Sequence, residues 1–181
     1  MSEMRIGLGV DVHRFAPAST AAVGVAAGVS PDAAPGEARG LVLGGVAFPG
    51  ERPLVGHSDA DAVAHSVADA ILGAAALGDL GAHFPDSDER WHGADSLELL
   101  ARCAALARHE GWQLVNADCT IVAERPRLSP ASVEMAVRLS AAAGGPVHVK
   151  ATRPERLGSL GRVEGLACFA VALLGRGELR E

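Results

Sequence analysis

The segment from residue 57 to residue 88 constrains the fold more than any other part of the chain, because it sets histidines and aspartates among alanine, leucine and valine. One apolar face recurs at helical spacing, at Val63, Ala64, Val67, Ile71 and Ala74. Asp61, His65 and Asp69 are four residues apart and fall on a different face. Ser58, with Asp61 three residues later, is expected to begin the helix as a capping box. The pattern predicts an imidazole between carboxylates on an exposed side, a layout typical of metal or phosphate chemistry.

Near the N-terminus, apolar residues alternate with others at a period of two, which predicts a half-buried strand. The apolar positions are Ile6, Leu8, Val10 and Val12. Asp11 and His13 lie two residues apart and point to the same side, where both can reach one ion. Gly7 and Gly9 on that side leave room for a ligand or another backbone. Together with His65, the pair supplies three ligands, the number that a catalytic zinc typically takes from a protein.

A structural interpretation of the same residues stays open at this stage. Asp11 and His13 could be polar groups at the end of a strand, and His65 could be a solvated helix histidine. The spacing of the three residues does not identify the ion. A metal site is therefore a hypothesis that needs a second line of support.

The rest of the chain alternates strand and helix patterns, which predicts an α/β fold of the α+β type, with a mixed sheet and helices on one face. Strands are expected at residues 41–48, interrupted at Gly44 and Gly45, and at 115–123, 147–152 and 166–174. The first helix should end around Gly78. A second helix should begin at Asp95, with Glu98 completing the capping box, and end at Gly111. A third should run from Ser129 and Pro130 to Gly144 and Gly145.

Composition limits the class of protein. The length of 181 residues suits a single domain, residues 1–181, and 49% of the residues are apolar, which is enough for a core. A net charge of -6, with no basic stripe and no aromatic platform, argues against nucleic-acid binding. No apolar run reaches the length of a membrane span, and no signal-peptide pattern opens the chain. We therefore expect a cytoplasmic protein that binds neither nucleic acid nor membrane.

The cysteines and the low aromatic content say more about packing than about chemistry. Cys103, Cys119 and Cys168 have no metal-like spacing and are expected to be reduced and buried. Aromatic residues make up only 3% of the chain, and small side chains bury little area each. A domain built in this way gains stability from association. His83, His92, His109 and His148 are interpreted as surface or loop histidines, with His109 near a helix C-terminus.

Residues 16–40 are rich in Ala, Gly, Pro and Ser and have no clear period. They are expected to form a flexible surface insertion, because a segment without an apolar period cannot bury a face. A lid over the site is the alternative, since the segment directly follows the strand that carries Asp11 and His13.

Several segments resemble the 2-C-methyl-D-erythritol 2,4-cyclodiphosphate synthase family, in the order found there and over most of the chain. They are RIGLGVDVHRF, LVLGGVAFPG, GHSDADAVAHSVADAILGAAALGDLGAHFPDSD, GADSLELL, VNADCTIVAERPRL and VKATRPERLGSLGRVEGLACFAVALL. The resemblance implies a homotrimer with active sites between adjacent subunits. It also implies that 4-diphosphocytidyl-2-C-methyl-D-erythritol 2-phosphate is cyclised and CMP released, when the 2-phosphate attacks the β-phosphate.

The resemblance also assigns roles to individual residues. Asp11, His13 and His65 would bind zinc or a similar divalent cation, and Glu155 would hold magnesium or manganese together with the substrate diphosphate. His57 would stabilise developing charge and, with Ser58, contact the substrate. The methylerythritol part would meet Asp79, Gly81, Phe84, Asp86 and Asp88.

A further set would bind the cytidine and phosphate groups, and it contains the clearest departures from the family. It comprises Ala123, Arg127, Thr152, Arg153 and Arg162. Arg127 stands where the family usually has Lys, and Arg153 replaces a Thr thought to assist the transition state. Arg153 could turn onto the diphosphate as a catalytic residue, or face solvent and leave the phosphate to its backbone N–H. Arg162 and Glu164 match residues of the trimer's central channel, where an isoprenoid diphosphate would fit, and Val163 replaces a Gly.

Two other functions are compatible with the same ligands. One is a zinc phosphohydrolase, in which solvent oxygen would enter the released phosphate. The other is a non-catalytic protein that binds a nucleotide or an isoprenoid diphosphate, for which Arg153 is the only favourable feature. The reaction product distinguishes all three.

Overall fold

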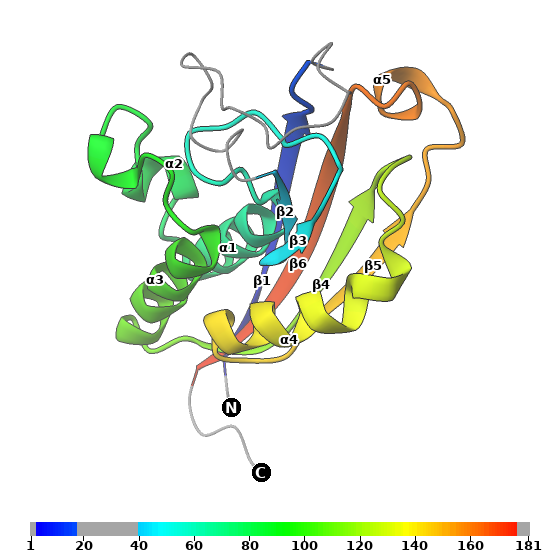
Figure 1. Ribbon diagram of the computed structural model, residues 1–181. Coiled ribbons are helices and arrows are strands. Elements are labelled where there is room, and N and C mark those ends of the chain that lie inside the picture. Colours follow the sequence, from blue (N-terminus) through cyan, green and yellow to red (C-terminus); the bar gives the residue numbers. More distant parts are fainter. Residues whose placement is uncertain (1–2, 18–39, 177–181) are drawn as a thin grey trace.

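A computed structural model describes residues 3–17 and 40–176. Its centre is a four-stranded mixed sheet in the order β1-β6-β4-β5, and helices cover one face of that sheet (Figure 1). The strands are β1 Glu3–Arg14, β4 Gln113–Val122, β5 Val147–Thr152 and β6 Gly165–Arg176. β6 is antiparallel to both neighbours, whereas β4 and β5 are parallel. The predicted mixed sheet with helices on one face is confirmed.

The remaining elements connect these strands. The longer helices are α1 Ala62–Ala75, α3 Ser96–His109 and α4 Ser132–Ala143. Short turns of helix are α2 Leu80–His83, η2 Glu89–Trp91, η3 Ser129–Ala131 and α5 Gly158–Gly161. Leu41–Leu43 and Val46–Phe48 form a separate antiparallel pair, β2 and β3, so the predicted interrupted strand is a hairpin that turns at Gly44 and Gly45.

Helix α1 lies directly against β1 because two glycines let the backbones meet. A Cβ atom added to Gly7 would lie 2.0 Å from the carbonyl oxygen of Ala70, and one added to Gly9 would lie 1.9 Å from that of Ser66. No real side chain tolerates such a contact, so each glycine is required by close approach. Of the two uses predicted for these glycines, room for another backbone is the one observed.

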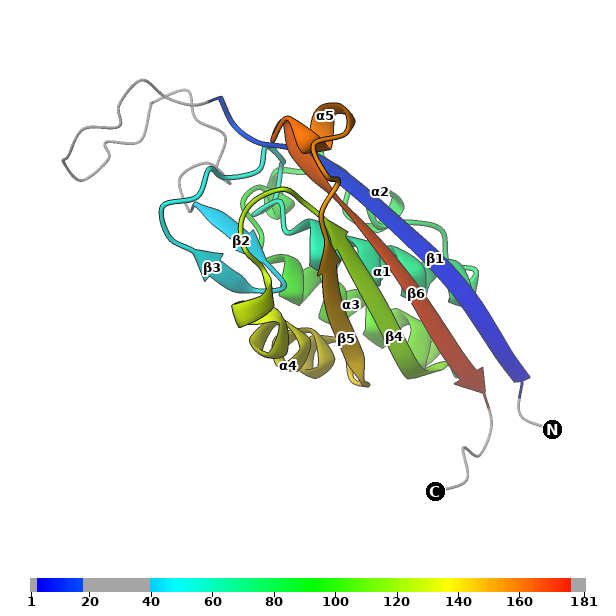
Figure 2. The same ribbon diagram turned by 90° about the vertical axis from the view of Figure 1, so that its right-hand side faces the viewer.

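The apolar side of β1 faces away from the helices. Met4, Ile6, Leu8 and Val12 are each more than half exposed, and Val10 is 45% exposed. Phe169 and Val171 of the neighbouring β6 continue the same surface. Figure 2 shows this open side of the sheet, with the helices behind it. The strand is half-buried as predicted, but it is the glycine side that packs on α1.

The start of α1 differs from the prediction. Ser58 does not cap the helix; Asp61 does, by accepting hydrogen bonds from the N–H groups of Val63 and Ala64. The same carboxylate accepts from the N–H groups of Gly44 and Gly45 at 2.8 and 2.7 Å, and therefore ties the hairpin to the helix. Asp61 is completely buried, so it belongs to the interior and not to an exposed polar face.

Other predicted boundaries can be compared directly. Asp95 caps α3 as expected, and Gly144 ends α4 in the left-handed conformation. Ser129 makes no capping hydrogen bond; residues 129–131 form a 3₁₀ turn before α4 begins. The predicted insertion at residues 16–40 lies, except at its ends, outside the described residues.

Cys103, Cys119 and Cys168 are free and buried, as predicted. None of the described helices is long and apolar enough to cross a membrane.

Candidate metal centre and substrate cavity

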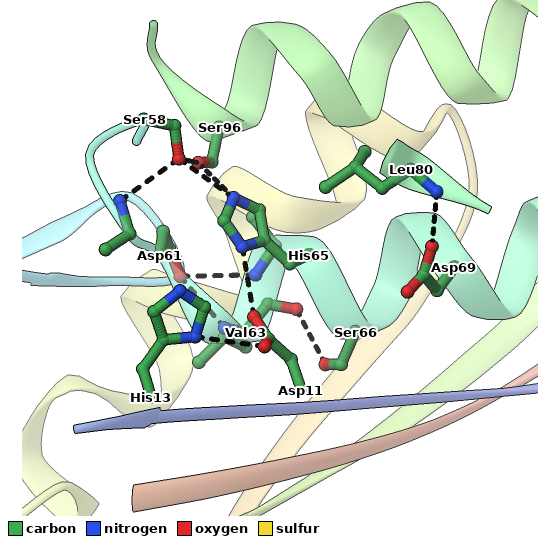
Figure 3. Close-up of polar contacts among 12 residues, drawn as sticks. Asp11, His13, Ser58, Asp61, Val63, His65, Ser66, Asp69, Leu80 and Ser96 are labelled. Atoms are coloured by element: carbon green, nitrogen blue, oxygen red, sulfur yellow. Dashed lines mark hydrogen bonds and ion pairs between the residues drawn. The ribbon is translucent and has the colours of Figure 1, made fainter. Parts of the chain in front are cut away.

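Asp11 and His13 of β1 meet His65 of α1 at one point between the strand and the helix (Figure 3). Asp11 Oδ1 lies 2.9 Å from His13 Nδ1, and Asp11 Oδ2 lies 3.0 Å from His65 Nδ1. One ligand atom from each residue lies within 4.8 Å of the others. Each side chain is less than a fifth exposed. The geometry therefore brings together the three residues that the sequence predicted as metal ligands.

The donor set fits a divalent cation. His13 Nδ1 is buried and has no hydrogen-bond partner among the described residues, although Asp11 Oδ1 is close to it. A buried imidazole nitrogen that lies 2.9 Å from a carboxylate oxygen, and has no other polar partner among the described residues, points toward a shared position for a cation. Two imidazole nitrogens and one carboxylate oxygen are ligands that zinc accepts, with a further position left for a substrate.

The electrostatics of the triad favour charge separation. Burial raises the pKa of Asp11, but the two imidazoles beside it lower that pKa more, so the net shift is downward. Burial lowers the pKa of His65, while the hydrogen bond and charge of Asp11 raise it to a net upward shift. Asp11 is therefore an anion, and a bound cation can take the place of the positive charge on His65.

Asp61 and Asp69, which flank His65 in the helical pattern, are not ligands of this centre. Asp61 is the buried helix cap described above. Asp69 Oδ1 accepts a hydrogen bond of 2.7 Å from the N–H of Leu80 and so fixes the start of α2. The prediction that His65 lies between the carboxylates of Asp61 and Asp69 is therefore wrong, because both carboxylates accept hydrogen bonds from backbone N–H groups.

A cavity of about 430 Å³ opens beside the triad. Of the predicted substrate residues it is lined by His13, His57, Ser58, Gly81, Phe84 and Asp86, together with the predicted ligand His65. His57 and Ser58 precede α1 by five and four residues, and Asp61 accepts hydrogen bonds from the N–H groups of Val63 and Ala64 in the first turn of that helix. His57 Nε2 is buried and has no hydrogen-bond partner within residues 3–17 and 40–176.

Sequence reasoning missed several residues of this cavity. Leu80, Trp91 and Leu99 supply apolar wall, and Phe84 meets Trp91 edge to face with ring centroids 4.9 Å apart. His92, interpreted as a surface histidine, stacks on His57 at 4.9 Å with an interplanar angle of 12°. Trp91 and His92 lie in a segment with no clear period, so only its position between two matched motifs could have drawn attention to it.

Two predicted substrate residues are already engaged in local structure. Asp79 caps α2 through the N–H of Ala82 at 2.8 Å. Asp88 caps η2 and forms an ion pair of 2.6 Å with Arg90. Neither carboxylate lines the cavity described above.

Three of the remaining predicted residues, Arg127, Arg153 and Arg162, line a different cavity, of about 780 Å³, between residues 124–127 and residues 153–163. Five arginines line it: Arg125, Arg127, Arg153, Arg156 and Arg162. Arg125 pairs with Glu51 at 3.2 Å and Arg162 with Glu164 at 2.7 Å. In the described part of the chain, no carboxylate forms an ion pair with Arg127 or Arg153. We call these five residues the arginine cluster; Arg156 likewise forms no ion pair with a described carboxylate, and its three unpaired members suit an anion.

Ala123, Thr152 and Glu155 stand next to the arginine cluster in the chain. Ala123 is buried and donates its N–H to the carbonyl of Thr152 at 3.1 Å, which joins the ends of β4 and β5. Glu155 is exposed and has a positive φ of 51°. Glu155 is not part of the group formed by Asp11, His13 and His65. One chain therefore does not bring the two predicted metal positions together.

A histidine–carboxylate centre set between a strand and a helix, beside a partly apolar cavity, is the arrangement of a metal-dependent enzyme that acts on a small molecule. Residues 4–175 match the YgbB family, so the chain belongs to this family.

Named relatives agree with this assignment. The 2-C-methyl-D-erythritol 2,4-cyclodiphosphate synthase of Geobacillus kaustophilus is 50% identical over 173 residues, which cover 94% of this chain and 97% of that protein. The bifunctional enzyme IspD/IspF of Anaeromyxobacter dehalogenans is 49% identical over 173 residues. This match covers 94% of the chain but only 39% of the bifunctional enzyme, so the chain corresponds to one part of it.

A solved structure shares the fold as well. The structure of a 2C-methyl-D-erythritol-2,4-cyclodiphosphate synthase in a CDP-bound form superposes with a TM-score of 0.75 at 31% identity. It covers 94% of this chain and 99% of that one.

Proposed function

We propose that the chain converts 4-diphosphocytidyl-2-C-methyl-D-erythritol 2-phosphate into 2-C-methyl-D-erythritol 2,4-cyclodiphosphate and CMP, a step of non-mevalonate isoprenoid precursor biosynthesis. The observation that carries the proposal is the convergence of Asp11, His13 and His65 beside a cavity of about 430 Å³, in a chain half identical to a synthase of that name. The reaction joins two anionic phosphate groups of one molecule, so its barrier is mainly electrostatic and positional.

Asp11, His13 and His65 would hold zinc or a similar divalent cation. A bound cation supplies Lewis-acid polarisation of a phosphate oxygen and neutralises developing negative charge. The chain prepares for it with three ligand atoms already within 4.8 Å of one another. Little reorganisation is then needed when the ion and the substrate bind.

Residues of the cavity would orient the methylerythritol part. The carboxylate of Asp86 can accept hydrogen bonds from substrate hydroxyls, and Phe84 offers an apolar wall beside the methyl group. His57 lines the same cavity, and its Nε2, which has no partner in the described part of the chain, can donate a hydrogen bond to a phosphate oxygen. Ser58 is nearly buried, so its hydroxyl is held in place at the same wall.

The arginine cluster would bind the cytidine diphosphate part. Among the residues that the structure describes, no carboxylate pairs with Arg127 or Arg153, and both can make charge-assisted hydrogen bonds to phosphate oxygens. The superposed structure with bound CDP supports a cytidine nucleotide as the ligand. Glu155 on the adjacent loop would hold magnesium or manganese through the diphosphate, the usual coordination of a hard ion with few protein ligands.

We further propose a homotrimer in which each active site combines the metal centre of one subunit with the arginine cluster of the next. Two observations support it. The apolar face formed by Met4, Ile6, Leu8, Val12 and Val171 is exposed in one chain, and such a face is typically covered by a partner. The two groups of site residues also surround separate cavities within one chain. The paired Arg162 and Glu164 would then line the central channel, where an isoprenoid diphosphate can bind.

The decisive experiment is a turnover assay with product identification. The purified protein is incubated with the diphosphocytidyl substrate, zinc and magnesium in ¹⁸O-labelled water. We expect stoichiometric CMP and cyclic diphosphate without ¹⁸O. Label in a released phosphate would indicate a phosphohydrolase, and tight binding of CDP without turnover would indicate a binding protein.

A further inference from the structure

The nitrogen of His65 that faces away from the metal centre is also engaged. His65 Nε2 lies 2.8 Å from Ser96 Oγ and 3.1 Å from Ser58 Oγ (Figure 3). Ser96 is the first residue of α3 and Ser58 belongs to the loop before α1, so two elements converge on this atom. Ser96 is 1% exposed and Ser58 is 8% exposed. Water therefore does not compete for these hydrogen bonds.

The direction of the hydrogen bonds follows from Asp59. Its carboxylate accepts from the hydroxyl of Ser96 and from the backbone N–H groups of Ser96 and Asp61, each of the latter at 3.2 Å. A carboxylate only accepts, so Ser96 donates its single hydroxyl proton to Asp59. Ser96 Oγ can then only accept from His65, and His65 must carry a proton on Nε2.

The hydroxyl of Ser58 is consistent with a proton on His65 Nε2. Ser58 Oγ accepts from the N–H of Ala60 at 3.2 Å and lies 3.4 Å from Ser96 Oγ. Ser58 can therefore donate its own proton to Ser96 without competing for the proton on His65. Each of these groups has a partner, and each hydrogen bond has one direction.

We propose that Asp59 and Ser96 are positioning residues that fix His65 with its proton on Nε2 and so present the Nδ1 lone pair to a cation shared with Asp11 and His13. A neutral imidazole with a proton on one nitrogen has its lone pair on the other. A carboxylate that acts on a ligand histidine through a hydrogen bond also raises the basicity of that ligand. The inference rests on the metal site of the proposed function, and it adds two residues that touch neither the cation nor the substrate.

The test measures metal binding directly. Zinc affinity is determined by competition with a chromophoric chelator, and the His65 tautomer is read from ¹H–¹⁵N spectra of the zinc-loaded protein. Ser96→Ala removes the acceptor for Nε2–H, and we expect zinc affinity to fall about 10–100-fold, the usual effect of losing an outer partner of a ligand. Ser96→Thr keeps the hydroxyl and should restore the affinity to within about threefold.

A matched control separates this role from general packing. Ser66 is completely buried in α1, and its hydroxyl donates to the carbonyl of Val63 at 3.0 Å and makes no hydrogen bond to His65. Ser66→Ala should leave zinc affinity and the His65 spectrum unchanged. If Ser96→Ala does not fold, Asp59→Asn serves instead: loss of the negative acceptor should weaken zinc binding and reduce the Nε2–H population of His65.

The outcomes distinguish this inference from the proposed function. Ser96→Ala or Asp59→Asn with wild-type zinc affinity and an unchanged tautomer would overturn the role of Asp59 and Ser96, while turnover by the wild type would leave the function in place. A wild-type protein that turns over substrate but binds no zinc would instead remove the metal site and the inference with it. Equal losses of zinc affinity in Ser96→Ala and Ser66→Ala would show that the loss comes from general packing and not from the hydrogen bond to His65.

Discussion

The metal centre and the arginine cluster are built in opposite ways. Asp11, His13 and His65 are mostly buried and held by hydrogen bonds from three different elements. The arginines are exposed and extend from loops, and only two of the five form ion pairs with carboxylates of the described residues. A cation site requires fixed spacing, which a packed strand and helix provide. An anion site made of long side chains requires only charge within reach, and it becomes ordered when a ligand or a neighbouring surface arrives.

The difference indicates which half of the site one chain can complete. The metal centre needs nothing from another subunit, because its ligands and their supporting groups all lie in the same chain. The arginine cluster faces a separate cavity and, in the proposed trimer, serves the metal centre of a neighbour. Changes in the two regions should therefore affect metal binding and assembly independently.

The largest effect is expected from His65→Ala. The variant loses one of three ligands and should bind no zinc at micromolar concentration, with kcat lowered about 10³-fold because the main electrostatic stabilisation is lost. Elemental analysis and the CMP assay measure the two effects. The fold should persist by circular dichroism, since α1 keeps its cap at Asp61. Full activity in the metal-free variant would contradict the mechanism.

The second-largest effect is expected from a substitution that tests whether the metal centre of one subunit meets the arginine cluster of another. Leu8 is 64% exposed on the open sheet face, and Leu8→Asp would place three unpaired carboxylates in a trimer interface. We expect monomers by light scattering and kcat/KM lowered about 10²-fold, with zinc affinity unchanged.

Val133→Asp is the matched control for this experiment, because Val133 is 75% exposed on α4, on the other side of the sheet. This variant should remain a trimer with normal activity. A fully active monomer of Leu8→Asp would show that one chain holds a complete site.

A smaller effect is expected at the arginine cluster itself. Arg153→Thr restores the residue that is usual in the family and removes a charged donor. We expect kcat/KM to fall about tenfold, the scale of one hydrogen bond to a charged group, with zinc affinity unchanged. An unchanged or higher kcat/KM would mean that Arg153 faces solvent and that His57 and the metals supply the stabilisation. A change in zinc affinity would instead show that the two regions are coupled within one chain.

The smallest effect is expected at the thiols, which the proposed site does not use. Burial raises the pKa of Cys103 to about 12, so almost no thiolate forms at pH 8. Iodoacetamide should therefore label Cys103 slowly in the native protein and fully in urea, as mass spectrometry can measure. Rapid native labelling would indicate that α3 opens, and with it the support that Ser96 gives to the metal centre.

The sequence predicted the parts of this fold that depend on local pattern. The strand pair of Asp11 and His13, the apolar face of α1 and the glycine that ends α4 all follow from residues within a few positions of one another. The three metal ligands were predicted because their spacing places each on one side of its element, and the resemblance to the family brought the two elements together.

The misplaced features depend on contacts between distant segments. Ser58 and Asp61 are both good helix caps. Asp61 is the cap because Gly44 and Gly45, 17 and 16 residues upstream, donate two further N–H groups to its carboxylate. The open face of β1 resembles a core strand in sequence, since alternation does not indicate which side a helix will cover. Ser96 gave no signal at all, because a serine that begins a helix is ordinary.

The closeness of α1 and β1 has a consequence for how this protein can change over time. Gly9 contacts the carbonyl of Ser66, the residue next to His65, and lies on the same face of β1 as Asp11. A single methyl group at position 9 would push apart the strand and the helix that carry the ligands, while leaving every ligand in place. The metal centre therefore depends on the absence of a Cβ atom at position 9, so it is sensitive to substitution of a residue that has no chemistry of its own.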